Sequence, residues 1–258
     1  MLLLLSLLAQ GAVPYPSVAS WTSYPGGVTT GGVLADLNHD GWLDLVVANG
    51  NDILRQRLEG YTNDGAGNYP TTPQWSSGDV DYHGHLSVGD VDGDGWEDVA
   101  VSVFLGSGGF GTKGRVKLYR NLGGALESLP SWSCTDRYYT FSCALGDADS
   151  DGDLDLAVAV GEPYYGAPEQ NRIYYNVGGT LQTSPGWLSA QSDHALDCAF
   201  GDVDGDGDLD LAFCTAGGPN RIHHQSGGAL ATSASWTSTD NNAQNGNSLC
   251  FGDVDADG

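Results

Sequence analysis

Five short acidic loops contain most of the residues in this sequence that could do chemistry. Each complete loop reads Asp-x-Asp-x-Asp-Gly-x-x-Asp, except that Asn replaces the second Asp of the first loop. The loops hold about two-thirds of the 33 acidic residues, and charge gathered so tightly needs cations to neutralise it. The predicted metal ligands are Asp36, Asn38, Asp40, Trp42 and Asp44; Asp90, Asp92, Asp94, Trp96 and Asp98; Asp147, Asp149, Asp151, Asp153 and Asp155; Asp202, Asp204, Asp206, Asp208 and Asp210; and Asp253, Asp255 and Asp257 in an incomplete fifth loop.

This loop pattern favours Ca²⁺, with one ion in each of the four complete loops and one in the truncated fifth. Calcium takes six to eight oxygen ligands at flexible geometry. Carboxylates at positions 1, 3, 5 and 9 supply side-chain oxygens, glycine at position 6 allows a sharp turn, and position 7 contributes a backbone carbonyl. Magnesium prefers a stricter octahedron with retained water, and zinc prefers His or Cys ligands. A solvated acidic turn would explain one loop, but four intact copies favour a cation cage.

The loops differ from EF-hands at position 12 and in their flanking segments. An EF-hand loop requires Glu at position 12 and a helix on either side. Position 12 is instead occupied by apolar residues inside segments that read as strands: Val47, Val101, Val158 and Phe213. The sequence therefore predicts an EF-hand-like cage set in a β-hairpin.

Three markers repeat in a fixed order along the chain. The acidic loops recur about every 55 residues, and a tryptophan precedes each one. The tryptophans are Trp21, Trp75, Trp132, Trp187 and Trp236. A polar residue followed by glycines forms a turn before each later tryptophan, as in 121–124, 176–179 and 225–228. Such regular spacing indicates one structural unit per repeat.

The unit reads as four short strands, which predicts an all-β fold and a β-propeller of four-stranded blades. Val/Leu/Ala-rich segments bounded by glycine flank each loop, a third strand comes next, and the tryptophan segment makes a fourth. A β-solenoid or a tandem of small β-domains is the alternative. We expect a lone fourth strand around Trp21, then about four blades and a truncated fifth, with seven blades (six to eight) in the intact protein.

The chain resembles the FG-GAP/VCBS repeats of integrin α-subunit propellers and of many secreted bacterial proteins. Phe200-Gly201 and Phe251-Gly252 match the first half of the FG-GAP motif just before an acidic loop. The resemblance covers about residues 17–258 and implies a propeller with calcium in the loops between the first two strands of each blade. The family is functionally broad, so it names neither substrate nor partner.

The first residues predict a secreted protein. Residues 1–12 resemble a signal peptide, and residues 13–258 form the expected propeller. The signal-like stretch is too short to span a bilayer, so no membrane insertion is expected. A net charge of -24 repels nucleic acid, which excludes that class of partner.

Cysteines and aromatic residues add weaker predictions. Cys198 and Cys214 flank the fourth loop symmetrically, so they are candidates for a cross-strand disulfide; two buried core residues are the alternative. Tyr164 and Tyr165 could stack on a sugar or anchor a protein, or pack between blades.

These observations favour a non-enzymatic extracellular module that binds a glycan or a protein and is rigidified by calcium. No catalytic residue is expected, because the sequence contains no nucleophile elbow, zinc-protease helix or phosphate loop. Two histidine pairs, His83 with His85 and His223 with His224, could suggest a transition-metal or catalytic site, but the sequence identifies no third ligand, so they are interpreted as ordinary turn or strand residues. A propeller-type polysaccharide lyase or hydrolase is the enzymatic alternative, and it would need a catalytic group in a central cleft. A structural spacer within a larger surface protein is the third hypothesis.

Overall fold

The structure, a computed structural model, describes residues 19, 21–23, 26–161, 166–239 and 246–252. Within these ranges the regular structure is entirely β, with sixteen strands in antiparallel pairs. The same ranges include no helix with the length and apolar composition needed to cross a membrane. The expected all-β class is confirmed.

The strands form four sheets, each built from four strands that are consecutive in the chain. Sheet 1 comprises β1 (Thr29–Ala35), β2 (Asp44–Gly50), β3 (Arg55–Tyr61) and β4 (Trp75–Ser76); sheet 2 comprises β5 (Tyr82–Gly89), β6 (Asp98–Leu105), β7 (Lys113–Tyr119) and β8 (Trp132–Ser133). Sheet 3 comprises β9 (Ser142–Gly146), β10 (Asp155–Ala159), β11 (Glu169–Tyr174) and β12 (Trp187–Asp193); sheet 4 comprises β13 (Ala195–Gly201), β14 (Asp210–Thr215), β15 (Arg221–His223) and β16 (Trp236–Thr237).

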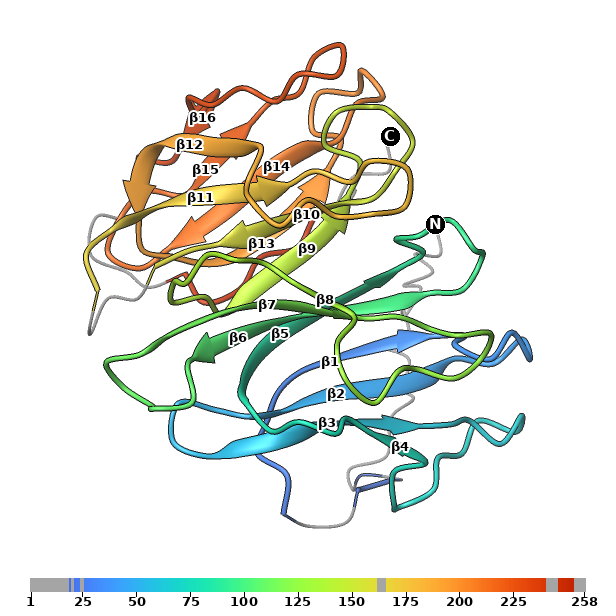
Figure 1. Cartoon of the computed structure of the whole chain (residues 1–258). Helices are drawn as coiled ribbons and strands as arrows, with labels where there is room; N and C mark the ends of the chain where they lie inside the picture. Colours follow the sequence, from blue (N-terminus) through green and yellow to red (C-terminus); the bar gives the residue numbers. More distant parts are fainter. Residues whose placement is uncertain (1–18, 20, 24–25, 162–165, 240–245, 253–258) are drawn as a thin grey trace, which may run out of the picture.

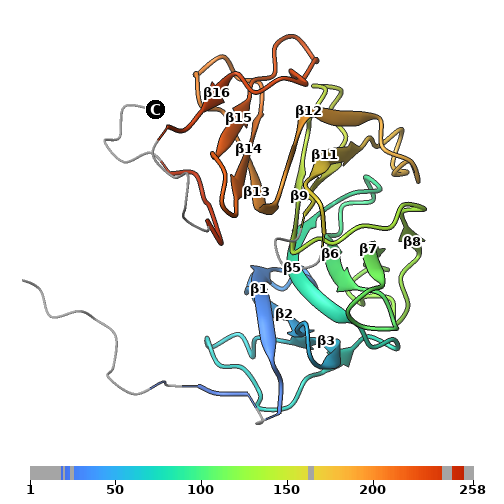
Figure 2. The same cartoon turned by 90° about the vertical axis from the view of Figure 1, so that its left-hand side faces the viewer.

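The sheets are arranged as the blades of a propeller. Figure 1 shows them stacked in chain order, and Figure 2 shows β1, β5, β9 and β13 innermost, with the other strands fanning outward. Each inner strand contacts the inner strand of the next sheet. The prediction of four-stranded blades is confirmed, including the order in which the tryptophan strand closes each sheet.

Hydrophobic cores lie between neighbouring sheets. One core joins Val116 and Leu118 of sheet 2 to Leu156 and Val158 of sheet 3, and another joins sheets 3 and 4. The Val/Leu/Ala runs that come directly after the loops are buried on both faces, as β6, β10 and β14 show. Both faces of each central strand are covered because a blade lies on either side of it, so these strands lack polar alternation.

A glycine stands directly before each complete loop except the first, where Ala35 takes its place, and it lets the next sheet approach closely. A Cβ added at Gly146 would lie 2.4 Å from Phe200, and one added at Gly201 would lie 2.6 Å from Phe251. The aromatic ring of one repeat thus packs on the glycine of the repeat before it. This contact gives the Phe-Gly pair its physical role.

The tryptophans join consecutive repeats. The indole N–H of Trp75 donates to Leu126 O at 2.9 Å, and those of Trp132 and Trp187 donate to the equivalent carbonyls of the next sheets. Trp21 lies in no strand of the described segments, contrary to the expected lone strand. Its indole nevertheless donates to Pro70 O at 3.2 Å, the same kind of contact.

The predicted Cys198–Cys214 disulfide is wrong. Both cysteines are buried free thiols, and the hairpin pairs Gly201 with Asp210, so Cys198 faces Phe213 and Cys214 faces Asp197. A symmetric hairpin would have needed a register shifted by one residue. Because side chains alternate along a strand, that single step places the two thiols on opposite faces of the sheet.

Candidate metal sites

Each complete acidic loop connects the first two strands of its sheet. The flanking register is the same in all four sheets, with the last strand residue paired to position 9 of the loop, as in Gly89 with Asp98 and Gly146 with Asp155. The expected placement of the loops within the blades is therefore confirmed. Position 9 begins the second strand, so the strand itself holds the last carboxylate in place.

Backbone N–H groups orient the carboxylates at positions 1 and 5. The N–H of the position 6 glycine donates to the position 1 carboxylate in every loop, at 2.9 Å for Gly41 and Gly95 and 3.0 Å for Gly152 and Gly207. The N–H of position 7 donates to the position 5 carboxylate at 2.9 Å in all four loops. These turns close the loop around its own acidic side chains.

The tight curl requires left-handed backbone at two positions. Position 6 has φ between 89° and 94° in the four loops, which explains glycine there. Position 4 is also left-handed, at 55° for His39 and 58° for Ser150, and glycine fills it in the other two loops. A non-glycine residue adopts this backbone conformation only at a cost in conformational energy. The loop sequence is therefore constrained by backbone geometry as well as by the placement of its charges.

Three carboxylates converge in each of the last three complete loops. Asp90, Asp92 and Asp94 place oxygens within 4.8 Å of one another, as do Asp202, Asp204 and Asp206. The third loop does so with Asp147, Asp149 and Asp155. Asp149 Oδ1 is buried and has no hydrogen-bond partner among the described residues. Such an orphaned anionic oxygen is costly unless a cation binds it.

The carboxylate at position 9 is the most buried group of each loop. Asp98 and Asp210 are 0% exposed. Each accepts two backbone N–H groups, one from position 2 of the loop and one from the turn after the third strand, as Val91 and Asn121 donate to Asp98. Burial raises the pKa of Asp98 to about 6 and that of Asp155 to about 7, although these hydrogen bonds act in the opposite direction.

The donor set fits a hard divalent cation. Within the loops themselves every candidate side-chain ligand is a carboxylate or amide oxygen, several oxygens converge, and one of them lacks any other partner. Repulsion among the neighbouring carboxylates contributes to the raised pKa of Asp149, after burial as the larger cause. A divalent cation would remove both penalties.

The residue at position 7 turns its side chain away from the acidic cluster. Asp153 and Asp208 accept the N–H of Gly178 and Gly227 at 2.8 Å, both in the turn after the third strand. In the first two loops Trp42 and Trp96 pack their rings over glycines of the equivalent turn. These contacts occupy the side chains of position 7, so the backbone carbonyl is the group by which this position could contribute to a metal site.

The turn after each third strand also holds the acidic loop of the preceding sheet. The side-chain amide of Asn121 donates to Leu37 O at 2.8 Å. Gln225, in the amide orientation that satisfies its neighbours, lies 3.2 Å from Ala148 O. A Cβ added at Gly179 would lie 2.6 Å from Asp92 O, so this turn packs directly on the loop. Each of the first three loops is therefore enclosed by two sheets.

Family comparison finds repeats along the same part of the chain, and each matched repeat ends within the second strand of a sheet. The model of the FG-GAP-like repeat matches residues 36–101, 103–158 and 159–213. This chain belongs to the FG-GAP-like repeat family. A comparison with curated proteins finds no match.

Solved structures share the propeller architecture of this FG-GAP-repeat chain. In all, 121 solved chains match. One is the crystal structure of BBS1N in complex with ARL6DN, soaked with lead, at 13% identity and a TM-score of 0.50. The match covers 81% of this chain and 57% of that chain, so the present chain spans less than two-thirds of its length. At that identity the likeness shows the fold alone.

Several predicted site residues lie outside the described residues of this FG-GAP-repeat chain. They are Asp253, Asp255 and Asp257 of the fifth loop, Tyr164 and Tyr165, and the expected signal peptide at 1–12. Asp36, Asn38, Asp40 and Asp44 are described, and the amide of Asn38 accepts the Asp40 N–H at 3.0 Å, as a carboxylate does in the second loop.

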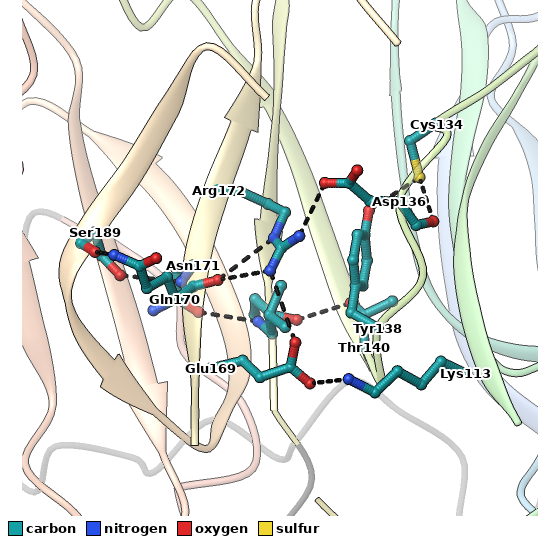
Figure 3. Close-up of polar contacts among 12 residues, drawn as sticks. Lys113, Cys134, Asp136, Tyr138, Thr140, Glu169, Gln170, Asn171, Arg172 and Ser189 are labelled. Carbon is teal, nitrogen blue, oxygen red and sulfur yellow. Dashed lines mark hydrogen bonds and ion pairs between the residues drawn. The ribbon is translucent and has the colours of Figure 1, made fainter. Parts of the chain in front are cut away.

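The sequence did not reveal an ion pair that recurs between the third strand of a sheet and the segment that enters that sheet. A basic residue of the third strand pairs with an acid in the segment that enters its sheet, as Arg221 does with Asp193 at 2.7 Å. Figure 3 shows the version in sheet 3, where Arg172 lies 3.0 Å from Asp136 and 4.5 Å above the Tyr138 ring. The signal was a basic-apolar-aromatic triplet recurring at 117–119 and 172–174, in a chain with only 9 Lys and Arg.

A polar cavity of about 360 Å³ lies where the four inner strands meet. His85 Nδ1 lies 3.4 Å from Asp197 Oδ1 across this cavity, and Leu249 N–H donates to Asp197 Oδ2 at 2.9 Å. Burial raises the pKa of Asp197, but hydrogen bonds from His85, Ser142 and Leu249 outweigh it and leave the pKa lowered. His83 and His85 both lie in β5, as expected for strand residues, although His83 is buried.

Proposed function

We propose that this chain is a calcium-loaded propeller module that binds an extracellular glycan or protein. The observation that supports it best is the convergence of three carboxylates in repeated loops, one of them with a buried, unpartnered oxygen at Asp149. Calcium would bridge carboxylates that otherwise repel one another, and would hold the first two strands of each sheet to the turn of the next. Its role is to rigidify the scaffold.

The binding surface would lie at the end of the sheets opposite the acidic loops. The loops between second and third strands differ in length and composition, which is typical of propeller surfaces that hold ligands. Two of them expose large apolar side chains: Ile53 is 77% exposed and Phe110 is 45% exposed. Exposed apolar groups of this kind can cover a sugar face or a partner surface.

Two further considerations support the proposal. The BBS1N structure, which shares the fold, is described in a complex with ARL6DN, so a related architecture holds a protein partner. The expected signal peptide would deliver the chain to a compartment where calcium is abundant enough to fill weak sites. Extracellular placement and calcium loading thus support one another.

Calorimetric titration of the metal-stripped chain tests the calcium part of the proposal. We expect about one ion per complete loop and a melting temperature that rises by many degrees between EGTA and calcium. An Asp149→Ala variant should lose one site, whereas Asp64→Ala, at an acidic residue outside the loops, should lose none. No heat of binding and identical melts in both buffers would refute calcium loading.

A glycan array and a pull-down with extracellular proteins, each run in calcium and in EGTA, test the binding part. Saturable binding that depends on an intact scaffold supports the module. If calcium loads the chain but neither assay detects a ligand, the scaffold proposal stands and the spacer hypothesis replaces the binder.

The central cavity favours one second candidate, a polysaccharide lyase or hydrolase. Asp197 would hold the His85 ring so that its other nitrogen faces the cavity, where it could accept or donate a proton. Incubating the chain with a panel of acidic and neutral polysaccharides would show unsaturated products or new reducing ends. Activity that disappears in His85→Gln but persists in Ser87→Ala would support an enzyme; no turnover on any substrate would count against it.

A further inference from the structure

The four complete loops are not equivalent, because a different residue stands beside each one. The position in question comes after the third strand and before the polar residue of the turn. It is occupied in turn by Thr62, Arg120, Tyr175 and His224. Arg120 and His224 each approach the carboxylate at position 3 of their own loop, so the residue at this position can change what the loop binds.

In the second loop this residue already supplies a positive charge. Arg120 Nη1 lies 3.2 Å from Asp92 Oδ2, and Arg120 Nη2 donates to Gly179 O at 3.1 Å. The guanidinium is thus held on both sides and neutralises one carboxylate of the loop.

In the fourth loop the same position offers a metal ligand. His224 Nδ1 lies 3.4 Å from Asp204 Oδ2, and Asp204, Asp210 and His224 place ligand atoms within 4.8 Å of one another. Asp204 also belongs to the group formed with Asp202 and Asp206, so the imidazole adjoins the same candidate ion position. Among the described residues no other such group contains a histidine.

The backbone holds His224 in place independently of any cation. Its N–H donates to Ser235 Oγ at 3.0 Å, and its carbonyl accepts the Ala231 N–H at 2.9 Å. The ring is half-buried beside a fully buried Asp210, so little reorganisation is needed for the imidazole and the two carboxylates to share one ion.

A mixed donor set of this kind suits a different class of cation. Calcium prefers an all-oxygen shell, whereas imidazole binds first-row transition metals, which also accept carboxylates. We infer that the fourth loop is a site for a borderline divalent cation such as Zn²⁺ or Co²⁺, with His224, Asp204 and Asp210 as ligands. This inference rests on the proposed loading of the loops with cations, and it assigns the fourth loop a preference that the other three lack.

Titration with Co²⁺ tests the inference, because its visible absorption reports nitrogen ligation directly. The full chain, without a histidine tag and saturated with calcium, is titrated with CoCl₂. We expect the parent chain to bind one Co²⁺ ion and to show a visible absorption band that reports ligation by the His224 nitrogen. In His224→Gln the affinity for Co²⁺ should fall at least about tenfold, while calorimetric calcium binding at the other loops is unchanged.

His39→Gln is the matched control. His39 is similarly exposed, lies in the first loop and is 3.3 Å from a carboxylate, Glu97, but it belongs to no group of three ligands among the described residues. This variant should bind Co²⁺ as the parent chain does. Equal Co²⁺ binding by the parent and by His224→Gln would overturn the inference, as would an equal loss in both variants.

A second variant guards against a folding defect. Asp204→Ala removes one predicted ligand at an exposed position, so Co²⁺ binding should weaken while the far-ultraviolet circular dichroism stays that of the parent chain. If Ca²⁺ binds and Co²⁺ does not, only this inference fails. If neither ion binds, the proposed calcium loading fails with it.

Discussion

The side-chain amide of Asn176 donates to the backbone carbonyl of Val91 at 2.7 Å, joining the turn of sheet 3 to the acidic loop of sheet 2. The same amide reaches Leu154 O at 3.1 Å, next to the loop of its own sheet. Asn176 and Val91 are both buried, so the bond between them has no ready access to water, whereas Leu154 is partly exposed. One side chain therefore holds two neighbouring loops at a fixed spacing.

Replacing Asn176 with alanine should destabilise the chain by about 1–3 kcal/mol, because the buried Val91 carbonyl and the partly buried Leu154 carbonyl lose their donor. Urea unfolding followed by tryptophan fluorescence measures the change. Val177→Ala in the same turn is the control, since Val177 is 63% exposed, and should shift stability by less than about 0.5 kcal/mol. Equal midpoints for Asn176→Ala and Val177→Ala would show that the contact between the loops does not matter.

The position 6 glycine should be intolerant of any side chain. Gly95 has φ of 91°, and nothing lies within 4 Å of a Cβ built there, so backbone strain alone opposes Gly95→Ala. We expect a loss of about 1–2 kcal/mol in unfolding free energy. Gly32→Ala is the control, because Gly32 lies in β1 with ordinary φ and its nearest neighbour is 3.6 Å away. The prediction fails if both variants unfold at the parent midpoint.

The sheets could be predicted from the sequence because their signals are local. The spacing of loop, third strand and tryptophan defines a hairpin with two further strands after it, and the structure has that order in every sheet. Position 9 of the loops, such as Asp155, was also identified from spacing alone. The burial of the position 9 carboxylate could not be predicted from spacing, because that burial depends on the neighbouring sheet.

The contacts between sheets could not be predicted. Asn176 and Val91 are 85 residues apart, and nothing in the pattern says which atoms of two repeats meet. The disulfide prediction failed because the strand register differs by one residue from the register that would pair Cys198 with Cys214. Spacing locates strands, whereas register and docking depend on the packing of side chains such as Phe200 on Gly146.

The thiols give a direct test of that corrected register. Cys250 is exposed, whereas Cys134, Cys143, Cys198 and Cys214 are buried. Burial raises the pKa of the Cys143 and Cys214 thiols to about 12, which leaves almost no thiolate to react at neutral pH. A thiol reagent should therefore label Cys250 alone in the native chain, and all five cysteines in denaturant without reductant. If only three thiols react in denaturant, two of the cysteines form a disulfide and the prediction of five free thiols is wrong.

The ion pairs between segments entering a sheet and its third strand make a prediction about acid stability. Lys117 Nζ lies 2.6 Å from Asp79 and also contacts Asp81, and its side chain is only 15% exposed. Burial raises the pKa of Asp79, but the hydrogen bonds from Lys117 and Tyr119 outweigh it and leave the pKa below its ordinary value. A carboxyl of lowered pKa stabilises the fold above its ordinary pKa, near 4, and loses that contribution as the pH falls further.

Lys117→Met should therefore cost about 3–5 kcal/mol at neutral pH, since two partly buried carboxylates lose their cation. Burial then raises the pKa of Asp79 with little to offset it, so the carboxyl takes up a proton at higher pH in the variant. The stability difference from the parent chain should shrink as the pH falls from 7 toward 4. Lys113→Met, at a pair with a 40% exposed lysine, should cost less than about 1 kcal/mol at any pH. Urea unfolding at several pH values measures both, and a difference for Lys117→Met that grows in acid would contradict the assigned pairing.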